Sequence, residues 1–65
     1  MSVGANIKAR REKLGITQSE LAEATYVSVA MISQIEANVK VPSLALAFRI
    51  ADKLSCQVEE FRDNN

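Results

Sequence analysis

Two helix-start signals lie eleven residues apart near the middle of the chain. Thr17 and Glu20 are spaced to form a capping box, in which the hydroxyl accepts a hydrogen bond from the backbone N–H group three residues later and the carboxylate accepts one from the N–H group of the cap. Ser28 is typical of a second N-cap. The first N–H groups of a helix have no partner within it and lie at its positive end, where they favour phosphate. We therefore expect Gln18, supported by Thr17, and Ser28 to be placed to bind phosphate.

The residues after the second cap predict an outward helix surface of small side chains, which can enter a groove of DNA. Its members are Val29, Ala30, Ser33 and Gln34. Glutamine can bond adenine N6 and N7 together, and small apolar side chains can contact a thymine methyl group. Gln34 lies four residues after Ala30 on the same face, although an exposed glutamine without a partner would look the same. Val29 and Met31 suit packing equally well, and Met31 could fold back against the first helix.

Hydrophobic spacing around the two caps predicts a helix-turn-helix. The capped helices are expected at about residues 18–25 and 29–36, across a tight turn. The apolar side chains that would share a buried seam between these two crossed helices are Leu21, Ala22, Val27, Ile32 and Ile35.

Three further helices are expected around this pair. The first runs from about Val3 to Leu14, and Gly15 supplies the left-handed residue that ends it. Asn38 can end the third helix in the same conformation, and Ser43 caps a fourth. The apolar residues of the fourth helix, spaced by three and four, are Leu44, Ala47, Phe48, Ala51 and Leu54. With a short fifth helix at about residues 58–61, the sequence predicts an all-α fold, a compact five-helix bundle.

Length and composition indicate a single domain over residues 1–65. Eight basic and eight acidic residues give a net charge of zero, whereas dedicated DNA-binding domains often carry a basic excess. The charges are unevenly spread, because basic residues dominate positions 1–13 and acidic residues dominate positions 52–63. No apolar run is long enough to span a membrane, and no signal peptide is recognisable, so a cytoplasmic location is expected.

Cysteine and histidine, which often bind metal ions or act in catalysis, are nearly missing from the sequence. The chain has one cysteine, Cys56, and no histidine. An internal disulfide is impossible, and we predict no metal site, no cofactor and no small-molecule ligand. Cys56 reads as a small thiol in a core or an interface. The sequence shows neither a nucleophilic side chain paired with a general base nor a phosphate-binding loop, so an enzyme is not predicted.

Taken together, these motifs resemble the XRE family of bacterial and phage regulators, which contains the phage repressors and Cro proteins. The matching segments are Leu14-Gly15-Ile16-Thr17-Gln18, Glu20-Leu21-Ala22, Val27-Ser28, Ile32-Ser33, Ile35-Glu36, Pro42-Ser43-Leu44 and Ile50-Ala51 with Leu54. The set is specific in this order and spacing, and it covers nearly the whole chain. The resemblance implies a bundle of five helices, encoded by a bacterium or a phage, that binds operator DNA, usually as a two-fold dimer.

The resemblance also implies roles for particular residues. Gln34 matches a position that commonly faces base edges, and Asn38 and Lys40 match positions that touch the DNA backbone beyond the recognition helix. Arg11 and Glu36 match positions that pair across the first and third helices, so we expect them to form a structural ion pair.

Two departures from the family pattern bear on function. Tyr26 stands where the turn usually has glycine, and a non-glycine residue with positive φ is strained by roughly 1–2 kcal/mol. At the start of the third helix, Val29, Ala30 and Met31 replace the polar or basic residues with which relatives often read bases. Readout by hydrogen bonds is therefore expected to be sparse.

A second apolar edge on the fourth helix suggests self-association. Leu46 lies off the predicted core stripe, and Val58 and Phe61 on the last helix can lie beside it. These three residues are our predicted homodimer interface. The alternative is that Val58 and Phe61 close the core and that Leu46 is an ordinary exposed leucine.

The sequence thus predicts a transcriptional regulator, with repression as the expected action. It would bind double-stranded DNA at a near-palindromic operator as a homodimer, with the third helix in the major groove. The competing hypothesis is a protein-interaction module of the same fold, which uses Val29, Ala30 and Met31 to bind another regulator. Zero net charge is the main support for this second hypothesis.

Overall fold

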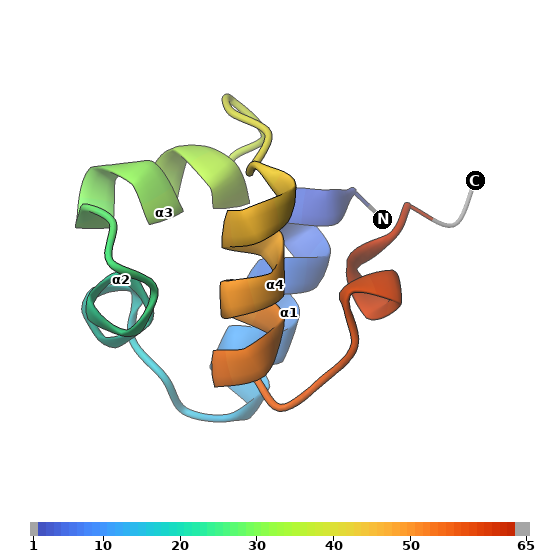
Figure 1. Cartoon of the computed structure of the whole chain (residues 1–65), viewed down its shortest axis with the longest axis horizontal. Helices are drawn as coiled ribbons and strands as arrows, with labels where there is room; N and C mark the ends of the chain where they lie inside the picture. Colours follow the sequence, from blue (N-terminus) through green and yellow to red (C-terminus); the bar gives the residue numbers. More distant parts are fainter. Residues whose placement is uncertain (1, 64–65) are drawn as a thin grey trace.

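Four α-helices and one short 3-10 helix make up residues 2–63, the part of the chain that this computed structural model describes (Figure 1). The elements are α1 (Val3–Lys13), α2 (Gln18–Thr25), α3 (Val29–Glu36), α4 (Leu44–Lys53) and η1 (Val58–Phe61). The predicted all-α class is confirmed. The predicted count of five α-helices is wrong in its last member, because residues 58–61 make a single 3-10 turn.

Each α-helix begins at a serine or threonine whose hydroxyl accepts a hydrogen bond from the backbone N–H group three residues later. These N-caps are Ser2, Thr17, Ser28 and Ser43. At α2 the capping box is complete, because the Glu20 carboxylate also accepts from the N–H group of Thr17 at 2.9 Å. Each cap satisfies a donor that the helix itself leaves without a partner, so the predicted starts of the four helices are confirmed.

Left-handed residues end the first three helices, as predicted for Gly15 and Asn38 from their types and for position 26 from the family pattern. Gly15 has a φ of 70°, Tyr26 of 63° and Asn38 of 62°. The Tyr26 side chain is 85% exposed, so no packing of its ring offsets the strain of that conformation. The end of α2 is held instead by Arg49 of α4, whose Nε donates to the carbonyl oxygen of Thr25 at 3.1 Å.

The core lies between the crossed pair α2 and α3 on one side and α1 and α4 on the other (Figure 1). In this view α4 lies in front of α1, and α3 lies at one end of the long axis with η1 at the other. Four of the five predicted seam residues, Leu21, Ala22, Ile32 and Ile35, are buried. Val27 is only partly buried, but it packs against the same cluster.

The predicted core stripe of α4 is wrong in its first half. Leu44 is 69% exposed and Phe48 is 54% exposed, whereas Leu46 and Ile50 are buried. The second half of the stripe, Ala51 and Leu54, is buried as expected. Apolar residues surround the first turns of this helix on nearly every side, so their spacing alone did not decide which side faces the core.

The predicted dimer interface is also wrong, because α4 turns Leu46 toward the core. Leu46 is only 6% exposed and Phe61 only 3% exposed, so neither side chain is available to a second molecule. Phe61 closes the core between α1 and α4, and Val58 is half-buried against it. The alternative for η1, in which Val58 and Phe61 close the core, describes the structure better. Leu46 is a core residue.

The start of α1 passes so close to the end of α3 that only glycine fits at position 4. A Cβ atom there would overlap the carbonyl oxygen of Ile35 and would lie 2.7 Å from that of Glu36. The N–H group of Gly4 donates to the Asn38 side-chain oxygen at 3.1 Å. The absence of a side chain therefore sets the distance between the two helices.

We expect Gly4→Ala to destabilise the protein, although alanine favours helix by about 1 kcal/mol over glycine. The overlap with backbone atoms of α3 should lower the free energy of unfolding by about 1–3 kcal/mol. Urea unfolding measures the change. Ala9→Gly, at an exposed position of the same helix, is the control and should lose only about 1 kcal/mol through helix propensity. A stabilised Gly4→Ala variant would contradict the close approach.

Candidate nucleic-acid interface

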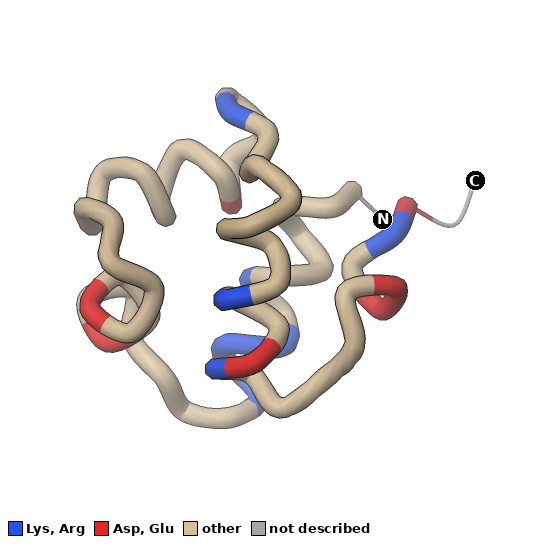
Figure 2. The backbone as a smooth tube through the Cα atoms, viewed as in Figure 1, with Lys and Arg blue, Asp and Glu red and all other residues tan. Residues whose placement is uncertain are grey.

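The outward surface of α3 is small, uncharged and free of core contacts. Val29 is 44% exposed, Ala30 and Ser33 are exposed, and Gln34 is half-buried. The only charged residue of this helix is Glu36 at its end, which is buried (Figure 2). Met31 packs against the core, in agreement with its packing alternative. The geometry brings together the predicted base-reading residues Val29, Ala30, Ser33 and Gln34 on one helix.

The N-termini of α2 and α3 each keep backbone donors that the caps do not use. Thr17 Oγ1 accepts from the N–H group of Glu20 at 3.0 Å, and Ser28 Oγ accepts from that of Met31 at 3.0 Å. The N–H groups of residues 18, 19, 29 and 30 have no partner within their own helices. They lie at the positive ends of the two helix dipoles, so both helix starts can receive an anion.

A buried network joins α1, α2 and α3 at one carboxylate. Arg11 of α1 donates to Glu36 of α3 through both Nε, at 2.7 Å, and Nη2, at 3.0 Å. Its Nη1 donates to the carbonyl oxygen of Ile16 at 2.8 Å. Gln18, the first residue of α2, donates from Nε2 to the same Glu36 carboxylate at 3.0 Å. The structure therefore contains the expected pair, and it sets the start of α2 beside the end of α3.

Sequence reasoning missed the role of Gln18 in this network. The sequence predicts that Gln18 binds phosphate, but its side chain is half-buried and bonded to Glu36. The two residues are 18 positions apart, so no local spacing rule could have linked them. The backbone N–H group of Gln18 keeps its place at the start of α2 whatever the side chain does.

The network lowers the pKa of the Glu36 carboxyl group. Burial alone raises this pKa, but the hydrogen bonds from Arg11 and Gln18 and the charge of Arg11 together outweigh burial. The hydrogen bond to Glu36 in turn raises the pKa of the Arg11 guanidinium. Both groups are therefore charged in the folded protein at neutral pH.

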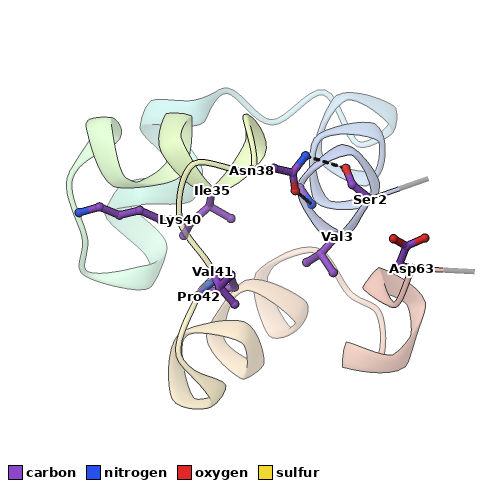
Figure 3. A pocket seen from close by; sticks show the side chains of 9 residues that line it. Ser2, Val3, Ile35, Asn38, Lys40, Val41, Pro42 and Asp63 are labelled. Carbon is purple, nitrogen blue, oxygen red and sulfur yellow. Dashed lines mark hydrogen bonds between the residues drawn. The ribbon is translucent and has the colours of Figure 1, made fainter.

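Asn38 ties the end of α3 to the start of α1 (Figure 3). Its side-chain oxygen accepts from the N–H group of Gly4 at 3.1 Å, and its side-chain nitrogen donates to Ser2 Oγ at 2.7 Å. The expected contact between the Asn38 side chain and DNA is therefore not what this geometry favours. Lys40, two residues further along, is exposed and borders the same pocket of about 260 Å³ as Asn38, and its side chain extends away from Asn38 and Ser2 (Figure 3).

Three of the arginines counted in the net charge donate hydrogen bonds to other segments of the fold. Arg10 donates from Nε to the carbonyl oxygen of Leu54 and from Nη2 to that of Ser55, both at 3.0 Å, and so holds the end of α4. Arg49 bonds to the carbonyl oxygen of Thr25 in the same way, and Arg11 bonds to the Glu36 carboxylate. The pairing of Arg11 with Glu36 was expected, but the bonds of Arg10 and Arg49 were not predicted, because nothing local to an arginine marks which carbonyl it will reach.

Within residues 2–63, no group of histidine, cysteine, aspartate and glutamate side chains is arranged to hold a metal ion. Cys56 is half-buried, and burial raises the pKa of its thiol, so it is not activated as a nucleophile. In the same range, none of the helices has the length and apolar content needed to cross a lipid bilayer.

Comparisons with known proteins agree with this geometry. A family profile described as helix-turn-helix matches residues 7–61. The HTH-type transcriptional regulator SutR of Escherichia coli (strain K12) is 39% identical over 59 residues, which are 91% of this chain and 33% of SutR. The chain thus spans about a third of the length of this curated relative. The P22 c2 repressor, solved in complex with the synthetic operator 9T in the presence of Tl⁺, superposes with a TM-score of 0.92. It is 29% identical, and the match covers 100% of this chain and 98% of that one.

We expect Glu36→Ala to destabilise the fold strongly. The substitution leaves the buried Arg11 guanidinium without its partner, which lowers the free energy of unfolding by up to about 3–5 kcal/mol. Thermal and urea unfolding measure the loss. Glu23→Ala, which removes an exposed carboxylate from α2, should change stability by no more than about 0.5 kcal/mol. Equal stability of the two variants would show that the network is not structural.

The lowered pKa of Glu36 predicts a stability that falls in acid. A glutamate in the unfolded chain has a pKa of about 4.3, so the contribution of Glu36 to stability is complete above that pH. It is lost as the pH falls through the lower pKa of the folded state. Urea unfolding at pH 7 and pH 3 should show a smaller pH effect in Glu36→Gln than in the wild type. Some pH effect should remain, because hydrogen bonds from Thr17 also lower the pKa of Glu20. An identical pH effect in both proteins would refute the prediction.

Proposed function

The chain belongs to the helix-turn-helix family, as a phage-repressor-like, DNA-binding transcription regulator of the XRE type, and from that premise we propose how it acts. It represses transcription by binding a near-palindromic operator as a homodimer, with α3 of each copy in the major groove. The observation that carries this proposal is the outward face of α3. Its side chains take part in neither the core nor the caps, and they leave a slim surface that fits a groove.

Base readout is assigned to the small side chains of this face. Val29 and Ala30 suit thymine methyl groups, because an apolar side chain can distinguish a methyl group by contact alone. Gln34 lies one turn further along and can bond both N6 and N7 of adenine. Ser33 is exposed beside them and can donate to or accept from a base. The readout is therefore mainly apolar, with one bidentate amide.

Phosphate contacts are assigned to the helix starts and to one lysine. The free N–H groups at the starts of α2 and α3, beside Thr17 and Ser28, each receive a phosphate oxygen. Lys40 supplies a charge beyond the end of α3. The side chains of Asn38 and Gln18 do not contact DNA in this proposal, and they instead hold the end of α3 and the start of α2 in place. Residues 1–65 form one DNA-binding domain, which works in the cytoplasm of a bacterium or a phage host.

A protein-interaction role is the second candidate, and the uncharged surface of α3 favours it. A surface with exposed Val29 and no cation would also suit another regulator. The salt dependence of binding to random duplex DNA separates the two functions. A phosphate binder loses affinity as salt rises, because bound counterions are released, whereas an interaction module shows no such binding. Binding without salt dependence would exclude the operator proposal.

We expect Gln34→Ala and Lys40→Ala to weaken DNA binding in different ways. Gln34→Ala removes a bidentate base contact, so it should reduce operator affinity by about 1–3 kcal/mol and leave binding to random duplex nearly unchanged. Lys40→Ala removes a phosphate contact, so it should weaken both kinds of binding alike and reduce the slope of log affinity against log salt concentration by about 1.

Fluorescence anisotropy on a selected operator and on a random duplex, at several salt concentrations, measures both effects. The operator is obtained by selecting bound sequences from a random duplex library. If Gln34→Ala loses affinity equally on both DNAs, the side chain does not read bases, and the assignment of Gln34 fails.

A further inference from the structure

The outward side chains of the first turn of α3 are both purely hydrocarbon. Val29 is 44% exposed, and Ala30 beside it is exposed. The first polar side chains of the outward face, Ser33 and Gln34, come one turn later. The one charged residue of the helix, Glu36, is buried at its far end, and Figure 2 shows the rest of α3 without charge. We call the two residues Val29 and Ala30 the apolar tip of α3.

Polar side chains at the starts of α2 and α3 are engaged within the fold. Ser28 Oγ accepts the cap hydrogen bond from the N–H group of Met31 at 3.0 Å. The Gln18 amide donates to Glu36, at the opposite end of α3 from the apolar tip, at 3.0 Å. The two side chains of the apolar tip have no polar atom of their own. They therefore cannot distinguish a hydrogen-bond donor from an acceptor on the edge of a base.

Both side chains of the apolar tip are rigid. Alanine loses no side-chain entropy when it is buried, and valine in a helix adopts a single χ1 rotamer about 90% of the time. The methyl groups of Val29 and Ala30 are therefore fixed relative to the backbone of α3. The backbone is held in turn by Ile32 and Ile35, which are each 1% exposed in the core. Fixed methyl groups can recognise another methyl group by shape.

Two pyrimidines can present a methyl group in the major groove of DNA. Thymine carries its methyl group at C5, beside the O4 acceptor, whereas cytosine carries an N4 donor and no methyl group. 5-Methylcytosine combines the N4 donor of cytosine with the methyl group of thymine at the same ring position. A side chain that bonded to the atom at position 4 would separate thymine from 5-methylcytosine, because one offers an acceptor and the other a donor. The apolar tip makes no such bond.

We propose that Val29 and Ala30 recognise the 5-methyl group of a pyrimidine whichever base carries it, so that 5-methylcytosine is bound by the same contact as thymine. This inference rests on the proposed function, because that function places α3 in the major groove. It adds a form of regulation to that function. An operator with cytosine at such a position binds the protein more tightly when this cytosine is methylated at C5.

Four versions of one selected operator test the proposal. Each pyrimidine position of one half-site is made in turn thymine or uracil opposite adenine, and 5-methylcytosine or cytosine opposite guanine. Burial of one methyl group should raise affinity about fourfold, the equivalent of about 0.8 kcal/mol. At a position read by the apolar tip, thymine should therefore exceed uracil, and 5-methylcytosine should exceed cytosine, by about this same ratio. Fluorescence anisotropy at one fixed salt concentration measures the four affinities.

A double variant assigns the effect to the apolar tip. Val29→Thr combined with Ala30→Ser adds a hydroxyl group to each side chain, so both methyl ratios should fall below about twofold. Both residues are exposed, so circular dichroism should show intact helices. Ser33→Ala is the matched control, since Ser33 is exposed on the same face and its substitution should leave both ratios unchanged.

Three results would overturn the inference. The first is equal binding of thymine and uracil at every position. The second is a position where thymine exceeds uracil while 5-methylcytosine and cytosine bind alike. The third is a double variant with unchanged ratios, because the preference would then arise from the DNA and not from the apolar tip. Failure to bind any duplex would reject the proposed function and the inference with it, whereas operator binding without a methyl preference would reject the inference alone.

Discussion

One buried carboxylate, that of Glu36, holds the arrangement on which every other feature depends. It receives hydrogen bonds from Arg11 of α1 and from Gln18 of α2, and it belongs to α3 itself. A buried charge without its partner is strongly destabilising, so the three helices cannot shift independently without breaking these bonds. The network therefore sets where the start of α2 lies relative to α3, and with it the spacing between the proposed phosphate and base contacts.

The parts of the fold that were predictable are those decided within a few residues. Caps at Thr17, Ser28 and Ser43 act over three positions, and Gly15 and Asn38 act at their own backbone, so the sequence reveals them directly. The bounds of α2 and α3 followed from these signals. The outward face of α3 was also predictable, because the apolar residues that it buries alternate clearly with those that it exposes.

Features decided by contacts between distant segments were not predictable in this way. The core side of α4 depends on how the helix is rotated against α2 and η1, and the unbroken apolar run at residues 44–48 leaves more than one side of its first turns equally suited to the core. The same holds for Asn38, whose side chain reaches Ser2 and Gly4 more than thirty positions away. The zero net charge was hard to interpret for a related reason, since Arg10, Arg11 and Arg49 bond to other helices and leave less charge for DNA.

In α3, the residues that stabilise the fold are different from those that face solvent, and this separation affects how the sequence can change over evolutionary time. Ile32, Ile35 and Glu36 hold the helix in place, while Val29, Ala30 and Ser33 face solvent and make no contact that the fold requires. Substitutions at exposed sites of this kind usually alter stability by less than about 0.5 kcal/mol. If these residues read bases as proposed, the chain can drift toward a new DNA sequence through single substitutions at those positions, with each intermediate still folded. Target preference and foldability are inherited through different residues of the same two turns of helix.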